Sequence, residues 1–174
     1  MRMRAAEGAH LACLVLIATL AWSLTSARAL AIGVEAGAPA PSVVLETLDG
    51  QVLSSDTLYR SPLALVFFFA ECPPCQVELP ALQSTYAEWR RKGGEALAVT
   101  AISSGTAVQS FVDEHGIQFP VALDPEGTVT RTFGVTKHPT LFFIDETGVI
   151  QRTWEGYHEG IASELLTELI AGSE

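Results

Sequence analysis

The feature that most constrains the fold is the stretch from Leu63 to Leu82, LALVFFFAECPPCQVELPAL. Its apolar start, Leu63 to Phe69, is too short to cross a membrane and is rich in Val and Phe, which predicts a strand buried on both faces of a sheet. Two cysteines that flank two prolines come next, followed by a helical pattern. The sequence therefore predicts a pair of thiols where a buried strand ends and a helix begins.

This position favours redox chemistry at Cys72 and Cys75. A thiol at a helix N-terminus lies near unpaired backbone N–H groups and the positive end of the helix dipole, and both stabilise a thiolate. The spacing allows a small disulfide that can open and close repeatedly. Pro73 and Pro74 suit the first helical positions, which need no N–H donor. We expect Cys72 to be the exposed nucleophile and Cys75 the shielded resolving cysteine.

Residues 1–29 are expected to be a targeting segment. Arg2 and Arg4 precede an apolar stretch, Leu11 to Leu24, and residues 27–29 (Ala-Arg-Ala) offer a cleavage site. Because the stretch is short for a span of about 20 residues, a cleaved signal peptide is favoured over a membrane anchor. The domain is then expected in the periplasm, or on the outer face of the inner membrane if the segment stays.

Residues 30–40, rich in Ala, Gly and Pro, predict a linker, and residues 41–172 predict a single domain with an ordinary core. The chain has a net charge of -10, and beyond residue 29 it holds 7 basic and 19 acidic residues. An acidic body argues against nucleic acid and anionic lipid as partners. With Cys13 in the apolar stretch, the domain holds two cysteines only. Because so short a loop stabilises a fold little, redox chemistry is favoured over a structural bridge or half of a metal site.

Strand and helix patterns alternate along the domain. They predict a hairpin about Asp49-Gly50, helices after the cysteines and at the C-terminus, and strands in between. This order predicts a mixed sheet with helices on both faces. The expected elements are strands 43–48, 51–53, 63–69, 96–102, 119–123, 140–144 and 149–154, and helices 55–59, 73–92, 108–115, 125–133 and 161–170.

A second group of candidate residues starts a late strand: Lys137-His138-Pro139-Thr140. A cis bond before Pro139 would turn the neighbouring backbone groups outward, where an extended peptide can pair with them. Alternatively, a trans proline merely begins the strand. Glu78, one turn after Cys75, is interpreted as a solvated helix charge in preference to a proton-transfer group. His115 and His158 are interpreted as surface residues.

The motifs FFFAECPPC, Glu78 with Pro80, and GVTKHPTLFFID, followed by a closing helix, resemble thioredoxin-fold proteins of the TlpA, ResA and DsbE type. The resemblance covers about residues 39–170. It implies an exported thiol-disulfide oxidoreductase with an N-terminal β-hairpin and an extra helix and strand at 106–123. It further implies that Cys72 is the nucleophile, Cys75 the resolving cysteine and Pro139 a cis proline beside them. Thr140 belongs to the same motif.

Glu71 departs from this family, which usually has Trp before the first cysteine. A carboxylate removes an aromatic docking surface and disfavours the Cys72 thiolate by like-charge repulsion, which favours a more reducing couple. A protonated His138 would act in the opposite direction, and we expect it to tune Cys72.

The leading hypothesis is reduction of disulfides in exported proteins, with apo-cytochrome c or copper-site proteins as the substrates that the resemblance implies. The resemblance also implies a membrane reductase that supplies electrons. We expect a monomer with no cofactor beyond the Cys72–Cys75 disulfide and no resident metal. A Cu(I)-binding module that uses Cys72, Cys75 and His138 is the alternative. A peroxiredoxin-like peroxidase is less favoured because Phe69 occupies the position of its required Thr, and a structural adaptor would tolerate loss of Cys72.

Overall fold

A computed structural model of the chain describes residues 34–101 and 103–171. The expected targeting segment and Cys13 lie outside the described residues. Within the described part, no helix combines the length and the apolar character needed to cross a membrane. The strands are β1 (Val44–Thr47), β2 (Val52–Ser54), β3 (Leu63–Phe67), β4 (Glu95–Thr100), β5 (Val121–Leu123), β6 (Thr140–Ile144) and β7 (Ile150–Glu155), and the helices are α2 (Ser55–Leu58), α3 (Pro73–Arg91), α4 (Gly105–His115), α5 (Thr128–Thr132) and α6 (Ile161–Ala171).

The strands form one mixed sheet in the order β2-β1-β5-β4-β3-β6-β7. β3, β4 and β5 run parallel, whereas β6 and β7 run antiparallel on one side and the β1–β2 hairpin pairs antiparallel with β5 on the other. The helix and strand between the two halves are α4 and β5. This arrangement confirms the expected thioredoxin-like fold with an N-terminal hairpin and a helix-strand insert.

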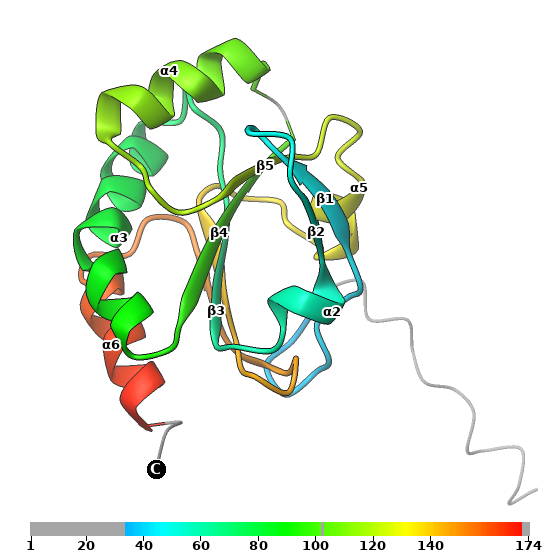
Figure 1. Cartoon of the computed structure of the whole chain (residues 1–174), viewed down its shortest axis with the longest axis vertical. Helices are drawn as coiled ribbons and strands as arrows, with labels where there is room; N and C mark the ends of the chain where they lie inside the picture. The colour runs from blue at the N-terminus through cyan, green and yellow to red at the C-terminus, as the bar shows by residue number, and fades with distance from the viewer. Residues whose placement is uncertain (1–33, 102, 172–174) are drawn as a thin grey trace, which may run out of the picture. The chain divides into compact units, whose positions relative to one another are not determined.

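β3 is buried on both faces, as its apolar run predicts. Ala64 and Val66 point into a core formed with α3, α4 and α6. Leu65 and Phe67 point into a second core that includes residues of α5 and the segment after α2. Figure 1 shows α3, α4 and α6 together on one side of the sheet, with α2 and α5 on the other. The strand that leads to the cysteines is therefore fixed from both sides.

Some boundaries differ from the prediction for local reasons. β5 begins at Val121 because the preceding Pro120 has no N–H for a strand ladder. α5 begins only after Gly127, whose φ of 64° is left-handed and breaks the expected helix at 125–133. α3 continues through Pro80 as one helix.

The end of the expected linker is attached to the sheet. The N–H of Gly37 donates to the carbonyl of Ile150 at 2.7 Å, and the N–H of Ala40 donates to the carbonyl of Gly148 at 2.8 Å. Pro39 forms a bridge with Val149 between these two bonds. Residues 37–40, which the prediction assigns to the linker, are therefore hydrogen-bonded to the end of the sheet near β7.

Candidate active site

The two cysteines meet at the N-terminus of α3. Cys72 is the N-cap residue, and its Sγ accepts a hydrogen bond from the N–H of Cys75 at 3.4 Å. The Sγ atoms of Cys72 and Cys75 lie 2.6 Å apart. Pro73 and Pro74 fill the first two helical positions, where no N–H is required. The predicted dithiol is thus assembled by the helix start, with both sulfurs in position to exchange a disulfide.

Cys72 is less exposed than predicted. Only 3% of its surface is accessible, against none for Cys75. The backbone of the late proline segment lies across it, because the carbonyl of His138 accepts from the Cys72 thiol at 3.7 Å. The order of exposure is as expected, but the nucleophile lies beneath the surface rather than on it.

The segment beside Cys72 contains a cis peptide bond between His138 and Pro139. Pro139 is buried, and its carbonyl accepts from the N–H of Gly156 at 2.7 Å. Thr140, buried at the start of β6, donates its hydroxyl to the carbonyl of Lys137 at 2.9 Å. The sheet register, which pairs Phe67 with Thr140, brings this segment beside the strand that leads to the cysteines.

His138 does not present a charged ring to the sulfur. Its imidazole packs edgewise on Phe69, with 5.1 Å between the ring centroids. Burial lowers the pKa of His138 below its ordinary value of 6.5, so the ring is neutral at neutral pH. The group that reaches Cys72 is the His138 carbonyl. Burial disfavours the charged form of the ring, and stabilisation of the Cys72 thiolate by a protonated His138 stays a prediction.

Glu78 is buried, so its interpretation as a solvated helix charge is wrong. Only 1% of its surface is accessible, and its Oε2 accepts from the backbone N–H of His158 at 3.0 Å. Burial raises the pKa of Glu78, whereas the hydrogen bond from the His158 N–H and the positive charge of His158 lower it. Burial also raises the pKa of the Cys75 thiol, and the negative charge of Glu78 raises it further. The carboxylate and the resolving thiol are thus electrostatically linked.

Glu71 is exposed and points toward the insert. Its Oε2 accepts from the hydroxyl of Ser103 at 2.8 Å, and the same hydroxyl accepts from the N–H of Ala70 at 2.8 Å. Ser103 therefore connects the turn before Cys72 with the loop that leads into α4.

Three residues in contact with the site, Ser103, Gly156 and His158, were absent from the predicted set. Ser103 was recognisable, because the ends of the parallel strands β3 and β4 meet at the same edge of the sheet. Glu155 pairs with Thr140 in the β6–β7 register, so the next residue, Gly156, lies near Pro139. His158 acts through its backbone N–H, whereas its imidazole contacts Glu164 at 2.6 Å. Because every residue except proline has a backbone N–H, residue type does not reveal such a donor.

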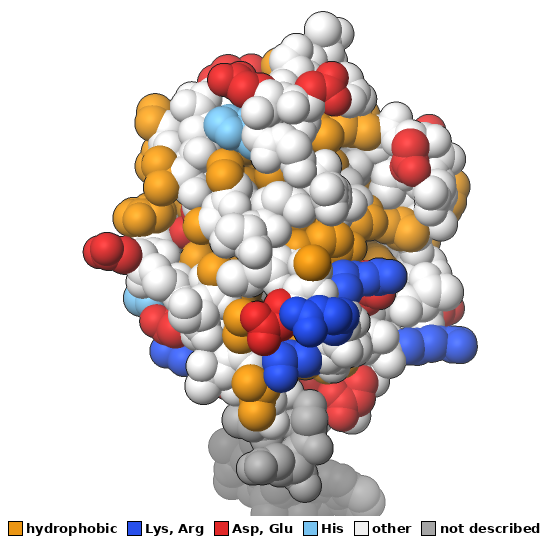
Figure 2. All heavy atoms as spheres, turned by 60° about the vertical axis from the view of Figure 1, so that its left-hand side comes forward, with side chains coloured by type: hydrophobic (Ala, Val, Ile, Leu, Met, Phe, Trp, Pro, Cys, Tyr) orange, Lys and Arg blue, Asp and Glu red, His pale blue; other side chains and the backbone are white. Residues whose placement is uncertain are grey.

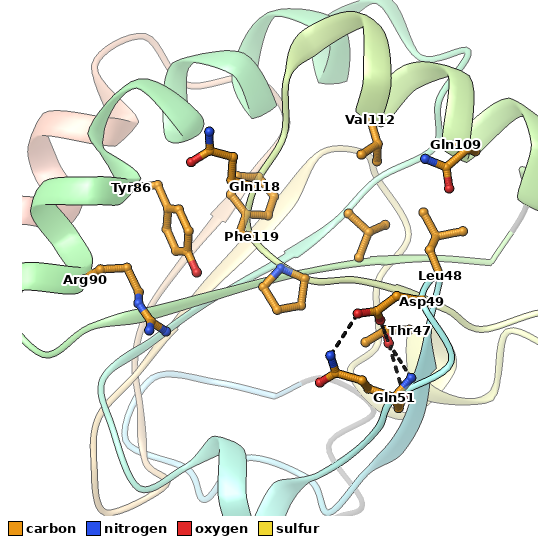
Figure 3. Close-up of a pocket in the computed structure, with 12 residues that line it drawn as sticks. Thr47, Leu48, Asp49, Gln51, Tyr86, Arg90, Gln109, Val112, Gln118 and Phe119 are labelled. Atoms are coloured by element: carbon orange, nitrogen blue, oxygen red, sulfur yellow. Dashed lines mark hydrogen bonds between the residues drawn. The ribbon is translucent and has the colours of Figure 1, made fainter.

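A separate hollow of about 430 Å³ lies between the β1–β2 hairpin, α3, α4 and the start of β5 (Figure 3). Figure 3 shows Gln51 joined to Asp49 and Thr47, while Tyr86 and Phe119 project from the other side. None of the predicted site residues lines it. Within residues 34–101 and 103–171, no group of three His, Cys, Asp or Glu side chains is arranged to hold a metal ion.

The sequence was compared with models of known protein families. The model described as the AhpC/TSA family matches residues 36–153, which is more than half of the chain. The chain belongs to the AhpC/TSA family. This match includes the cysteine turn and the cis proline described above.

Similar curated proteins of this family are named thiol-disulfide oxidoreductase ResA. The protein from Halalkalibacterium halodurans is 33% identical over 135 residues, which cover 78% of this chain and 75% of that protein. The Bacillus subtilis protein is 31% identical over 144 residues, which cover 82% and 80% respectively. Together with the paired sulfurs, these relatives identify this member of the AhpC/TSA family as a thiol-disulfide oxidoreductase.

Solved structures agree with the fold. A Chlorobium tepidum protein described as thiol:disulfide interchange protein DsbE superposes with a TM-score of 0.75 and 26% identity, covering 82% of this chain and all of that one. A Mycobacterium tuberculosis peroxidoxin, BcpB, has a TM-score of 0.71 but 19% identity over 79% of this chain and 97% of its own, which shows a shared fold alone. In this chain the position expected to carry a peroxidase Thr is occupied by Phe69, whose ring contacts His138.

Proposed function

We propose that this oxidoreductase reduces disulfides in exported proteins. The observation that carries the proposal is the position of Cys72, which caps α3 beside Cys75 while its sulfur faces the backbone of the cis-proline segment. An extended substrate that pairs with that segment would bring its disulfide to Cys72. Glu71, a carboxylate one residue before the nucleophile, is proposed to favour a reducing couple through its negative charge.

The reaction balances with the two cysteines alone. The Cys72 thiolate attacks one sulfur of the substrate disulfide, and the other substrate sulfur leaves with the bonding electrons and takes a proton. Cys75 then loses its proton and attacks the Cys72 sulfur, which releases the second substrate thiol. The substrate gains two electrons and two protons, and the Cys72–Cys75 pair becomes a disulfide. A dithiol protein must reduce that disulfide for another cycle.

Glu78 is proposed to accept the proton of Cys75. Burial raises the pKa of the Cys75 thiol, so this cysteine needs a base when it attacks the mixed disulfide. Burial also raises the pKa of Glu78, which makes this carboxylate a stronger base than an exposed one. The bond from His158 holds one carboxylate oxygen in place.

The setting of the reaction is proposed from the sequence. Residues 1–29 act as a signal peptide, or as a membrane anchor if they are retained, and place the domain in the periplasm or on the outer face of the inner membrane. The substrates are apo-cytochrome c or copper-site proteins, and a membrane reductase supplies the electrons. The acidic domain, acting as a monomer, would not use nucleic acid as a partner.

The test is to trap the substrate. A Cys75→Ser variant cannot resolve the mixed disulfide, so it should accumulate as a covalent adduct with exported proteins that reductant releases. Cys72→Ser should form no adduct, and Cys72→Ser with Cys75→Ser is the matched control. The purified wild-type domain should have a reduction potential low enough to reduce the trapped protein. A Cys75→Ser variant that traps nothing, or a domain that only oxidises thiols, contradicts the proposal.

A further inference from the structure

The loop between β7 and α6 is fixed to the active site at two points. The N–H of Gly156 donates to the carbonyl of Pro139 at 2.7 Å, and the N–H of His158 donates to Glu78 at 3.0 Å. Tyr157 lies between these two donors. Its Cα is therefore held between the cis proline and the buried carboxylate, whatever its side chain does.

The side chain of Tyr157 is directed to solvent. Tyr157 is 51% exposed, and it is one of a few large hydrophobic residues in the described part of the chain that are so accessible. Another, Val77, is 55% exposed on α3. Val77 precedes Glu78 and Tyr157 precedes His158, so these two exposed side chains each neighbour one end of the same hydrogen bond.

The surroundings of this loop are apolar and carry charges of both signs, because Lys137, two residues before Pro139, is exposed and ion-paired with Glu155. Pro73 and Pro74 are exposed at the start of α3, and the exposed carboxylates nearby are Glu71 and Glu159. Figure 2 shows that Lys and Arg side chains gather in the lower half of this face, away from the start of α3, whereas hydrophobic atoms extend over its upper half. A segment with an apolar side chain complements the apolar part of such a surface.

We propose that Tyr157 is a specificity-determining residue, which contacts an apolar side chain next to the reacting cysteine of a protein substrate. The inference rests on the proposed reduction of protein disulfides. A tyrosine with two rotatable side-chain bonds offers a large contact area at a small cost in entropy, so it suits this role.

The test compares two synthetic peptides with an internal disulfide, one with Leu beside the attacked cysteine and one with Gly there. Wild type, Tyr157→Ala and Tyr157→Phe are assayed for kcat/KM with each peptide, with Val52→Ala as the control. Val52 is 69% exposed on β2, at the opposite edge of the sheet. We expect Tyr157→Ala to lose about tenfold with the Leu peptide, which corresponds to one aromatic contact, and to keep its rate with the Gly peptide.

Tyr157→Phe and Val52→Ala should match the wild type, and the reduction potential should be the same in all four proteins. Equal losses of Tyr157→Ala with both peptides would indicate a structural role for Tyr157 and would overturn the proposal, as would no loss with the Leu peptide. If Tyr157→Ala gives either of these two results while the wild type still reduces both peptides, the proposed function stands and only this inference fails. A wild type that reduces neither peptide overturns both.

Discussion

The carboxylate of Glu71 accepts a hydrogen bond from the Ser103 hydroxyl, which in turn accepts one from the N–H of Ala70. The residue before the nucleophile is thus joined to the loop that begins the insert helix. Two separate effects meet here, the negative charge of Glu71 and the backbone bond made by Ser103, and substitution can separate them.

Replacing Glu71 by Gln removes the charge and keeps a hydrogen-bond acceptor for Ser103. Because a negative charge beside the dithiol disfavours the more negatively charged reduced state, we expect the reduction potential of the Gln variant to become less negative, by about 10 mV for an exposed charge pair. Equilibration with glutathione buffers measures it. A more negative potential in the variant would contradict the like-charge argument.

Replacing Ser103 by Ala leaves the N–H of the buried Ala70 without its partner. We expect the variant to lose about 1–3 kcal/mol of unfolding free energy. The neighbouring Ser104→Ala is the control, because it removes only the N-cap bond of α4 to Ala107 and should cost about 1 kcal/mol. Urea denaturation of both variants measures the difference. Equal stability of Ser103→Ala and wild type would show that Ala70 finds another acceptor.

Glu78→Gln distinguishes two roles of the carboxylate. If Glu78 accepts the proton of Cys75, the variant should resolve mixed disulfides about 100-fold more slowly. If Glu78 acts only through its negative charge, which raises the pKa of the Cys75 thiol, the variant should resolve them faster. Stopped-flow kinetics with a preformed mixed disulfide separates these outcomes, and we expect the slower rate.

Glu78 also sets a dependence of stability on pH. Burial raises its pKa above 4.5, so the folded state binds this proton more tightly than the unfolded state does. The stability that this group contributes is fully present below pH 4.5 and is lost as pH rises through the folded pKa. We expect Glu78→Gln to have a higher unfolding free energy than wild type at neutral pH and to lose that advantage at about pH 4. Urea midpoints at the two pH values test this, and an advantage confined to acid would contradict it.

Thr100, at the end of β4, is a site for stabilisation. It is 2% exposed, and among the described residues its hydroxyl has no hydrogen-bond partner. Thr100→Val keeps the shape and removes the buried polar group, so we expect a gain of about 1 kcal/mol in unfolding free energy. Thr130→Val, which removes a hydroxyl bonded to Asp124, should instead lose about 1 kcal/mol. A loss of stability in Thr100→Val would reveal a partner for its hydroxyl.

Gly94 is required by the packing of Trp89. A Cβ at residue 94 would collide with the indole, whose Nε1 donates to the carbonyl of Glu95 at 2.8 Å. We expect Gly94→Ala to lose about 1–3 kcal/mol in thermal or urea unfolding. Gly105→Ala, where a Cβ meets only ordinary contact with Leu123, is the control and should be neutral or stabilising. A neutral Gly94→Ala would mean that the indole shifts freely.

The cysteine turn and the alternation of strands and helices were predictable because each depends on local sequence, whereas the residues alone left the isomer before Pro139 open. Leu63 to Phe67 has the apolar run of a doubly buried strand, and Pro73 and Pro74 mark the helix start. The resemblance in GVTKHPTLFFID then placed Pro139 beside Cys72. These signals are carried by residue type and spacing along the chain.

The burial of Glu78 and the shielding of Cys72 were not predictable in the same way. Glu78 follows Cys75 by three residues and precedes Leu82 by four, so it shares their helix face, but an acidic residue type argued for exposure. The loop that covers it follows it by about 80 residues. Cys72 is covered by the backbone of His138, and a backbone carbonyl has no identity in the sequence. Both depend on contacts between distant segments, which periodicity does not report.

The pairing of the N-terminal hairpin with β5 affects how the chain is made. β1 leaves the ribosome early, but its sheet neighbour on the inner side, β5, is synthesised only after the dithiol and the insert helix. Until then the hairpin has an unsatisfied edge that offers free backbone groups to other strands. A newly made chain is therefore most vulnerable to misassociation in the interval before Val121 to Leu123 emerge.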